Sequence, residues 1–142
     1  MANKLRGEVE IELAGEKWGL RPTFEALSNI ESKLNKSIPE IVREQRQGSI
    51  RFNTVATIIW EGLIGANEGR PPISKTRSGK SLRYEEVGEM IVRDGLVRVI
   101  SQDGLIMFLL HGLAGDQRMQ EAEENEKAGK TEVAENPTTR AE

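Results

Sequence analysis

The chain contains no cysteine, a single histidine and few aromatic residues, which make up 4% of its 142 residues. Without cysteine it can form neither a disulfide nor a thiolate metal site, so a reducing cytoplasm fits best. The longest unbroken apolar run, residues 105–110, is far too short to span a bilayer, and the first residues show no apolar core of signal-peptide length. We therefore expect a soluble, unsecreted protein with no membrane partner.

Residues that could carry catalysis are equally scarce. His111 has no companion at a recognisable spacing, so we interpret it as a packed or surface histidine rather than a general base or metal ligand. Residues 78–81 resemble the end of a phosphate-binding loop, but Ser74 stands where that motif needs a glycine. The sequence predicts no catalytic, metal or cofactor site, and it does not favour an enzyme.

The most informative stretch, residues 5–34, reads as a β-hairpin followed by an amphipathic helix. Between Gly7 and Leu13 apolar residues alternate with three glutamates, as in a strand with one buried face. A glycine-containing reversal follows, and Trp18 and Leu20 continue the alternation, which predicts a hairpin over residues 5–21. Pro22 stops the ladder, and Thr23 can cap a helix over residues 23–35 whose apolar face includes Phe24 and Leu27.

Further helices are predicted over residues 38–47, 53–65, 83–94 and 96–113. Ser37 and Glu40 have the spacing of a capping box at the start of the first of these. The helix over 53–65 shows a wide apolar stripe and a narrow polar one made of Thr54, Thr57 and Glu61. The expected fold is therefore α+β, with the N-terminal hairpin packed on a bundle of four to five helices in one domain, residues 1–115.

The apolar run in the last predicted helix is the first candidate for a partner-binding surface. It is apolar all round, so it must be buried in the domain's own core or bound to an apolar helix of another protein. The second alternative assigns partner binding to Leu105, Met107, Phe108 and Leu109. Trp60 is a further candidate, because large aromatic residues are frequent in interface hot spots, although burial is the commoner role.

A basic loop over residues 66–82 is the second candidate. The loop and its end carry five cations and, among acidic residues, only Glu68; the cations are Arg70, Lys75, Arg77, Lys80 and Arg83. They could contact phosphate or an acidic partner, or the segment could be a solvated, mobile connection. The overall charge of −3 argues against a nucleic-acid binder.

The C-terminal residues 116–142 are rich in glutamate and offer almost nothing to bury. This composition predicts a disordered acidic tail. Such a tail can keep an aggregation-prone complex soluble, or it can be a terminus without a role.

The N-terminal pattern resembles the tail assembly chaperone family of gene transfer agents and tailed phages. The residues that carry the resemblance are the Arg-Gly-Glu at 6–8, the alternating strand, the Ala-Gly-Glu-Lys at 14–17, residues 20–24 and residues 27–31. The resemblance covers about the first 65 residues, and residues 84–115 more loosely. The basic loop and the acidic tail depart from the family pattern.

This resemblance implies a non-enzymatic protein that binds the tape measure protein, keeps it soluble and promotes assembly of the tail tube. The major tail tube protein and a second copy of the chain are further candidate partners. The implied location is the cytoplasm of the bacterial host or producing cell, with the protein absent from the mature particle. A structural minor tail or tail-completion protein is the alternative, and a nucleic-acid-binding regulator that uses the basic loop is a weaker one.

Overall fold

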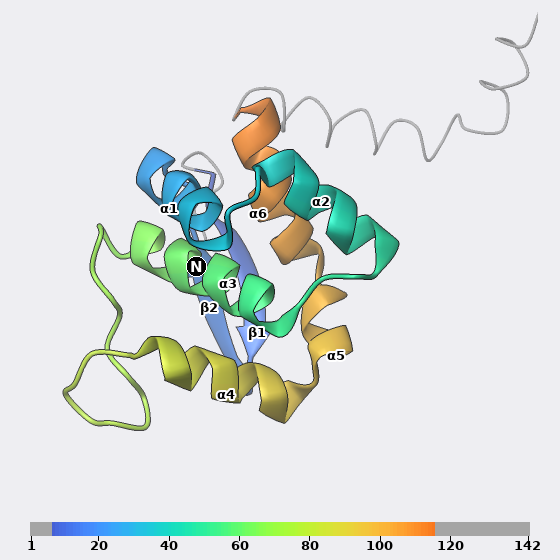
Figure 1. Ribbon diagram of the computed structural model, residues 1–142. Helices are drawn as coiled ribbons and strands as arrows, with labels where there is room; N and C mark the ends of the chain where they lie inside the picture. Colours follow the sequence, from blue (N-terminus) through green and yellow to red (C-terminus); the bar gives the residue numbers. More distant parts are fainter. Residues whose placement is uncertain (1–6, 116–142) are drawn as a thin grey trace, which may run out of the picture.

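The computed structural model describes residues 7–115, which form a two-stranded hairpin and six helices. The strands are β1 (Val9–Leu13) and β2 (Glu16–Leu20), and the helices are α1 (Phe24–Leu34), α2 (Ile38–Gln47), α3 (Phe52–Ala66), α4 (Tyr84–Asp94), α5 (Leu96–Ile100) and α6 (Asp103–Ala114). In Figure 1, α3 runs through the middle of the molecule, with the hairpin behind it and α4 below it. The α+β class and the hairpin on a helical bundle are confirmed.

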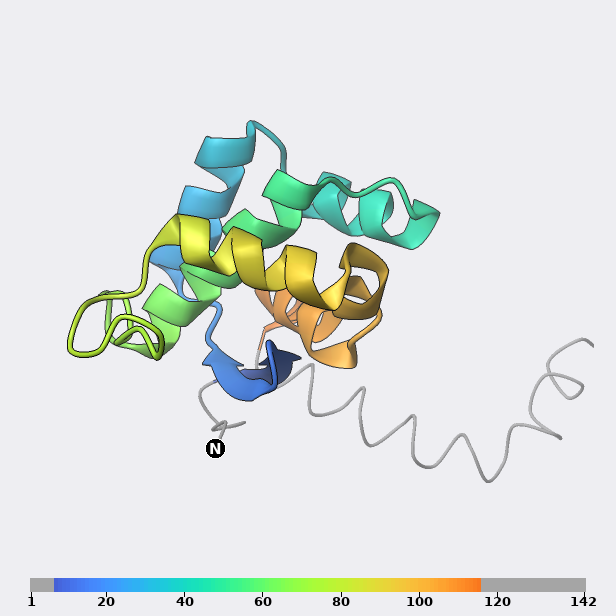
Figure 2. The ribbon, with the colours of Figure 1, turned by 90° about the horizontal axis from the view of Figure 1, so that it is seen from below.

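The hairpin closes through a two-residue turn whose conformation the sequence permits. Ala14 and Gly15 have φ of 55° and 79°, the left-handed pair that a tight turn needs to match the twist of the strands. The register pairs Ile11 with Trp18. Both side chains are buried, as are Leu13 and Leu20, so one face of the hairpin packs on the helices. Figure 2 shows the hairpin lying across one side of the helical layer.

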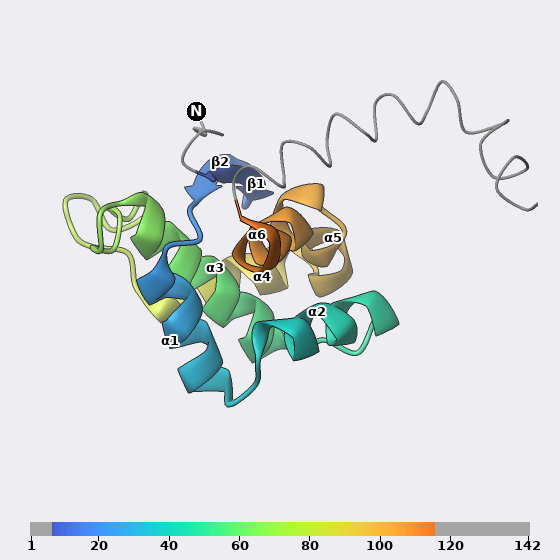
Figure 3. The same cartoon turned by 90° about the horizontal axis from the view of Figure 1, so that it is seen from above.

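Helix α3 is the centre of the packing, and even its polar stripe is buried. It contacts α1, α4 and β2 (Figure 3). The stripe of Thr54, Thr57 and Glu61 is polar, as expected, but all three residues are buried. Glu61 is compatible with burial because Lys33 Nζ lies 2.5 Å from its carboxylate and Asn29 Nδ2 donates to it at 3.2 Å.

The helix predicted over residues 96–113 is wrong as a single element, because the chain breaks it at Ser101 and Gln102. Ser101 Oγ donates back to the carbonyl of Val97 at 2.6 Å, which competes with helix continuation. The side chain of Gln102 makes two hydrogen bonds to the backbone of Glu12 on β1. The turn redirects the chain so that α6 packs against β1, which an unbroken helix could not do.

Two capping predictions are confirmed, and one core prediction is wrong. Thr23 caps α1 through a bond from Ala26 N, and Ser37 and Glu40 form a reciprocal capping box on α2. Phe24, however, is 87% exposed at the first position of α1, whose buried residues are Ala26 and Ile30. The predicted acidic tail, residues 116–142, lies outside the described residues.

Candidate functional site

The apolar run of α6 is mostly core. Leu105, Phe108 and Leu109 are fully buried, which agrees with the alternative that this run packs inside its own domain. Phe108 lies against α3, where a Cβ on Gly62 would stand 3.0 Å from its ring. Met107 is half-buried. In this fold the three buried residues offer no surface to a partner, so an apolar binding surface has to be sought elsewhere.

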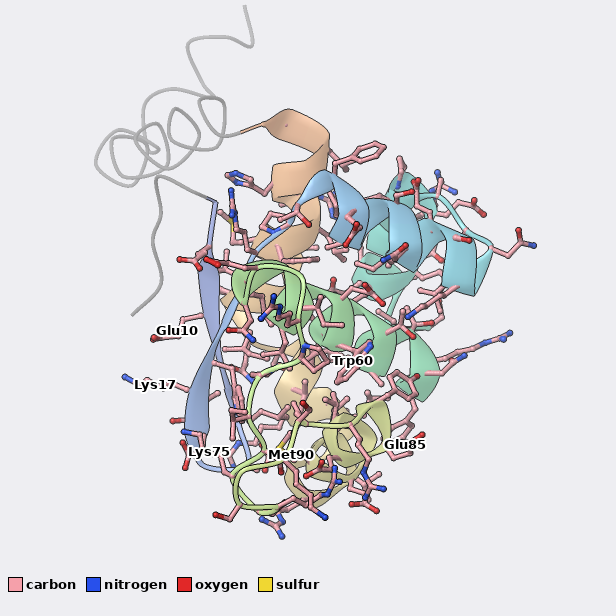
Figure 4. All side chains as sticks on the ribbon, turned by 90° about the vertical axis from the view of Figure 1, so that its left-hand side faces the viewer. Glu10, Lys17, Trp60, Lys75, Glu85 and Met90 are labelled. Atoms are coloured by element: carbon pink, nitrogen blue, oxygen red, sulfur yellow. The ribbon has the colours of Figure 1, made fainter. Side chains whose placement is uncertain are left out.

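Trp60 is also tied into the fold. Its ring meets Tyr84 edge to face, with the centroids 6.2 Å apart, and it packs against the core while remaining half-buried. Figure 4 labels Trp60 on α3. The geometry is that of an aromatic pair that joins α3 to α4.

An open apolar groove lies between the start of α3 and α4. Its volume is about 600 Å³. Phe52 and Ala56 line it from α3, and Tyr84, Gly88 and Val92 line it from α4. The spacing of four residues on each helix places each set on one helical face. Phe52 is 48% exposed and Val92 is 67% exposed, so the groove presents two large apolar side chains to solvent.

The floor and rim of this groove suit a helix. A Cβ added at Gly88 would meet nothing within 4 Å, so the missing side chain leaves a depression in α4. Glu85 and Glu89 line the groove from α4, and Asn53 lines it from α3. An apolar stripe can therefore lie on the floor while basic residues beside the stripe reach the two carboxylates.

The basic loop has internal hydrogen bonds. It folds back on itself through a bond from Ser74 N to Lys80 O at 2.7 Å and another from Leu82 N to Pro72 O at 2.7 Å. Leu82 is buried in the core cluster. The loop is therefore a folded part of the molecule.

Glu86 on α4 anchors the loop. Ser74 Oγ donates to its carboxylate at 2.7 Å and Thr76 Oγ1 at 2.9 Å, and Arg77 and the backbone N–H of Arg83 donate to the other oxygen. The pKa of Glu86 is lowered to about 2, and the largest cause is the hydrogen bond from Ser74. Hydrogen bonds from Thr76, Arg83 and Arg77 lower the pKa further, and burial of the carboxylate opposes them. Glu86 is therefore charged at every ordinary pH.

The structure does not gather the five loop cations into one binding site. Lys75 Nζ lies 2.9 Å from Glu16 of β2, and Arg77 and Arg83 pair with Glu86. Within residues 7–115, Arg70 and Lys80 make no ion pair. Three of the five charges are thus used to hold the loop, which leaves little for phosphate.

Residues 7–115 contain no group of three side chains suited to hold a metal ion. No helix among them is long and apolar enough to cross a membrane. His111 packs against Gly7, whose Cβ would stand 2.5 Å from Nε2.

Comparison with known protein families relates the N-terminal part of the chain to a described family. Residues 6–72 match the family described as phage tail tube protein, GTA-gp10. This segment, which we call the tail-family segment, is slightly less than half of the chain and contains the hairpin, α1, α2 and α3. It relates the chain to phage and gene transfer agent tails, and the description of the family names a structural tail protein. No curated protein and no solved structure gave a significant match.

The groove is hard to predict from the sequence because its residues are divided between two helices. Phe52 occupies the first position of α3, one residue before the helix that the sequence predicts over residues 53–65. Val92 follows the buried Ile91 in the sequence and points the other way. The i, i+4, i+8 series of Tyr84, Gly88 and Val92 was the available signal, since it marks a second face on α4.

Proposed function

We propose that this protein is a non-enzymatic chaperone of tail assembly, which binds an apolar-striped helical segment of the tape measure protein and keeps it soluble. The match of the tail-family segment supports a role in a phage or gene transfer agent tail. The observation that carries the chaperone function is the open groove between α3 and α4, with Phe52 and Val92 exposed to solvent. Exposed apolar side chains in a concave site favour a binding role.

The groove fits the chemistry of the proposed partner. A helix laid in a groove binds through apolar residues at i, i+3, i+4 and i+7. Phe52 and Val92 provide apolar contact, and Glu85 and Glu89 provide charge for basic flanking residues. Figure 4 shows Glu85 directed outward at the surface. The expected partner segment is therefore apolar on one stripe and basic beside it.

Co-expression with the tape measure protein of the same gene cluster tests this function. Gly88→Lys places a long side chain in the groove and leaves α4 a better helix former, so the fold should persist. Gly88→Ala is the matched control, since it gains the same propensity without filling the groove. We expect soluble co-purification with the wild type and Gly88→Ala and its loss with Gly88→Lys. Equal capture by all three would exclude the groove, and an insoluble tape measure in every case would exclude the chaperone.

A structural role in the particle is the second candidate, because the description of the matched family names a tail tube protein. The chaperone should be confined to the cytoplasm of the producing cell and absent from finished particles. Mass spectrometry of purified particles separates the two roles: a stoichiometric amount of this chain would establish the structural one. A nucleic-acid regulator has less support, because three of the five loop cations are paired inside the protein.

A further inference from the structure

Of the two outer edges of the hairpin, the edge of β1 is covered by other described residues. On β1, Glu12 N–H donates to Gln102 Oε1 at 2.6 Å, and Gln102 Nε2 donates to Glu12 O at 2.7 Å. Gly104 of α6 lies so close to β1 that a Cβ there would stand 2.3 Å from Glu10 O. Figure 3 shows α6 beside β1, with β2 on the other side, toward the loop. The edge of β1 is therefore covered by α6 and the residue before it.

The edge of β2 is open over two residues. The backbone N–H and C=O of Glu12 bond to Gln102, so Glu12 and its partner Lys17 are a pair without hydrogen bonds between the two strands. In an antiparallel ladder every second pair is of this kind, so the pair of Glu10 and Gly19 also lacks hydrogen bonds between the strands. The N–H and C=O groups of Lys17 and Gly19 therefore point away from β1. Within residues 7–115 these four groups have no hydrogen-bond partner. A Cβ at Gly19 would meet nothing within 4 Å, so access is not obstructed there.

The open stretch has defined ends. Arg21 is the next residue whose backbone points outward, and its N–H donates to Gly62 O of α3 at 3.0 Å. Toward the turn, Lys75 of the loop reaches across to Glu16. The edge can therefore pair with a short extended segment, but the loop stands on the same side of β2 (Figure 1), which leaves little room for a whole second domain.

A pocket of about 300 Å³ adjoins this edge on the inner side of the hairpin. Trp18 borders it from β2, loop residues 74–77 form a second wall, and Met90 lines it from α4. Lys75 Nζ lies 5.5 Å from the centre of the Trp18 ring. In an added strand, side chains on the same face as Trp18 would point to this pocket, and the alternate ones would lie beside Lys17 on the outer face.

We propose that the free edge of β2 accepts an extended segment of another protein in which apolar and acidic residues alternate. Its backbone pairs with Lys17 and Gly19, its apolar residues lie against Trp18 and the adjoining pocket, and its acidic residues face Lys17. Strand addition of this kind takes affinity from backbone hydrogen bonds and specificity from alternate side chains. A lysine on an edge discourages neutral strands. Figure 4 shows Lys17 pointing away from the helices, where an acidic residue of the added strand could meet it.

The sequence of β1 supplies the probe, because β1 already pairs with β2 by this chemistry. The test uses a peptide with capped ends and the sequence of residues 7–14, GEVEIELA, and a peptide of the same composition, GVIEELEA, in which the alternation is broken. Binding to the full chain is measured by isothermal titration. Amide exchange at Lys17 and Gly19 reports whether the peptide pairs there.

The decisive variant is Gly19→Pro, which removes one outward N–H and no bond of the β1–β2 ladder. We expect GEVEIELA to bind, to slow exchange at both amides, and to lose affinity by about tenfold in Gly19→Pro, while GVIEELEA binds at least about tenfold more weakly. Lys17→Glu, a second variant that keeps every backbone group, should weaken binding by about fivefold.

Equal binding of the two peptides, or unchanged exchange at Lys17 and Gly19, overturns the proposal. A dimer in sedimentation that dissociates in Gly19→Pro also overturns it, because the occupant would then be a second copy. This site is separate from the groove of α3 and α4. Gly88→Lys should leave peptide binding unchanged, so the two proposals can fail independently.

Discussion

Alanine substitution of two phenylalanines should affect different properties: stability at one position and partner binding at the other. Phe108 is fully buried against α3, whereas Phe52 is 48% exposed at the groove. Replacing a fully buried phenylalanine with alanine typically costs about 3–5 kcal/mol, because apolar contacts are lost and a cavity remains. At Phe52 about half of the side chain is already in water, so we expect a cost of about 1 kcal/mol or less.

The assay is thermal denaturation followed by the fluorescence of the two tryptophans, Trp18 and Trp60. For a domain of this size a loss of 1 kcal/mol lowers the melting temperature by about 4–8 °C, so Phe108→Ala should lower it by about 15–30 °C. Phe52→Ala should change it by a few degrees at most but abolish capture of the tape measure protein. An unchanged midpoint for Phe108→Ala would refute the assignment of α6 to the core and restore it as a candidate binding surface.

Three further predictions concern two glycines, the pH dependence of stability, and truncated chains. Gly65→Ala would place a Cβ 2.4 Å from Arg21 O, so it should destabilise the protein by about 1–3 kcal/mol. Gly88→Ala meets no neighbour within 4 Å and gains helix propensity, so it should stabilise the protein by about 1 kcal/mol. Thermal melts of the two variants measure both effects. The pKa of Glu86 is lowered from 4.5 to about 2, so its contribution to stability is present above pH 4.5 and is lost as the pH falls toward 2; in melts over this range, Glu86→Gln should show a weaker pH dependence than the wild type. A fragment that ends at residue 72 should lack cooperative unfolding by circular dichroism, while a fragment that ends at residue 115 should retain it, because α4 and α6 complete the core.

Much of the fold could be predicted because local signals and tertiary packing agree in the N-terminal half. The alternation before Ala14, the cap at Thr23 and the capping box at Ser37 each depend on a few neighbouring residues, and the structure contains all of them. Such signals are readable because caps and tight turns are satisfied within four residues.

The features that the sequence did not predict depend on residues far apart in the chain. The break before α6 is stabilised by Gln102, whose partner Glu12 is 90 residues away. The conformation of the loop depends on Glu86, one of three glutamates on α4, and the spacing of the three does not mark it as the anchor. Ser74 reaches Glu86 only because the loop folds back, and no spacing rule relates a serine to a carboxylate twelve residues later.

The groove also depends on residues that are far apart in the chain. Side-chain periodicity on α3 and α4 gives two separate helical faces, and only their antiparallel packing makes Phe52 and Val92 walls of one groove. The apolar composition of α6 predicted that it must be covered, but composition does not say by what. Its own domain covers it.

The limits of the tail-family segment bear on where function can reside. The segment ends at residue 72, inside the basic loop, so it supplies β2 and α3 but not α4 or α6. Yet α3 packs against α4, and β1 packs against α6, so the shared segment is not a folding unit in this chain. The groove takes one wall from the segment and one from outside it, whereas the open edge of β2 lies wholly within it. If the edge serves a function common to tail proteins of this family, its chemistry belongs to the segment itself, and the groove can be specific to chains that carry an α4 of this kind.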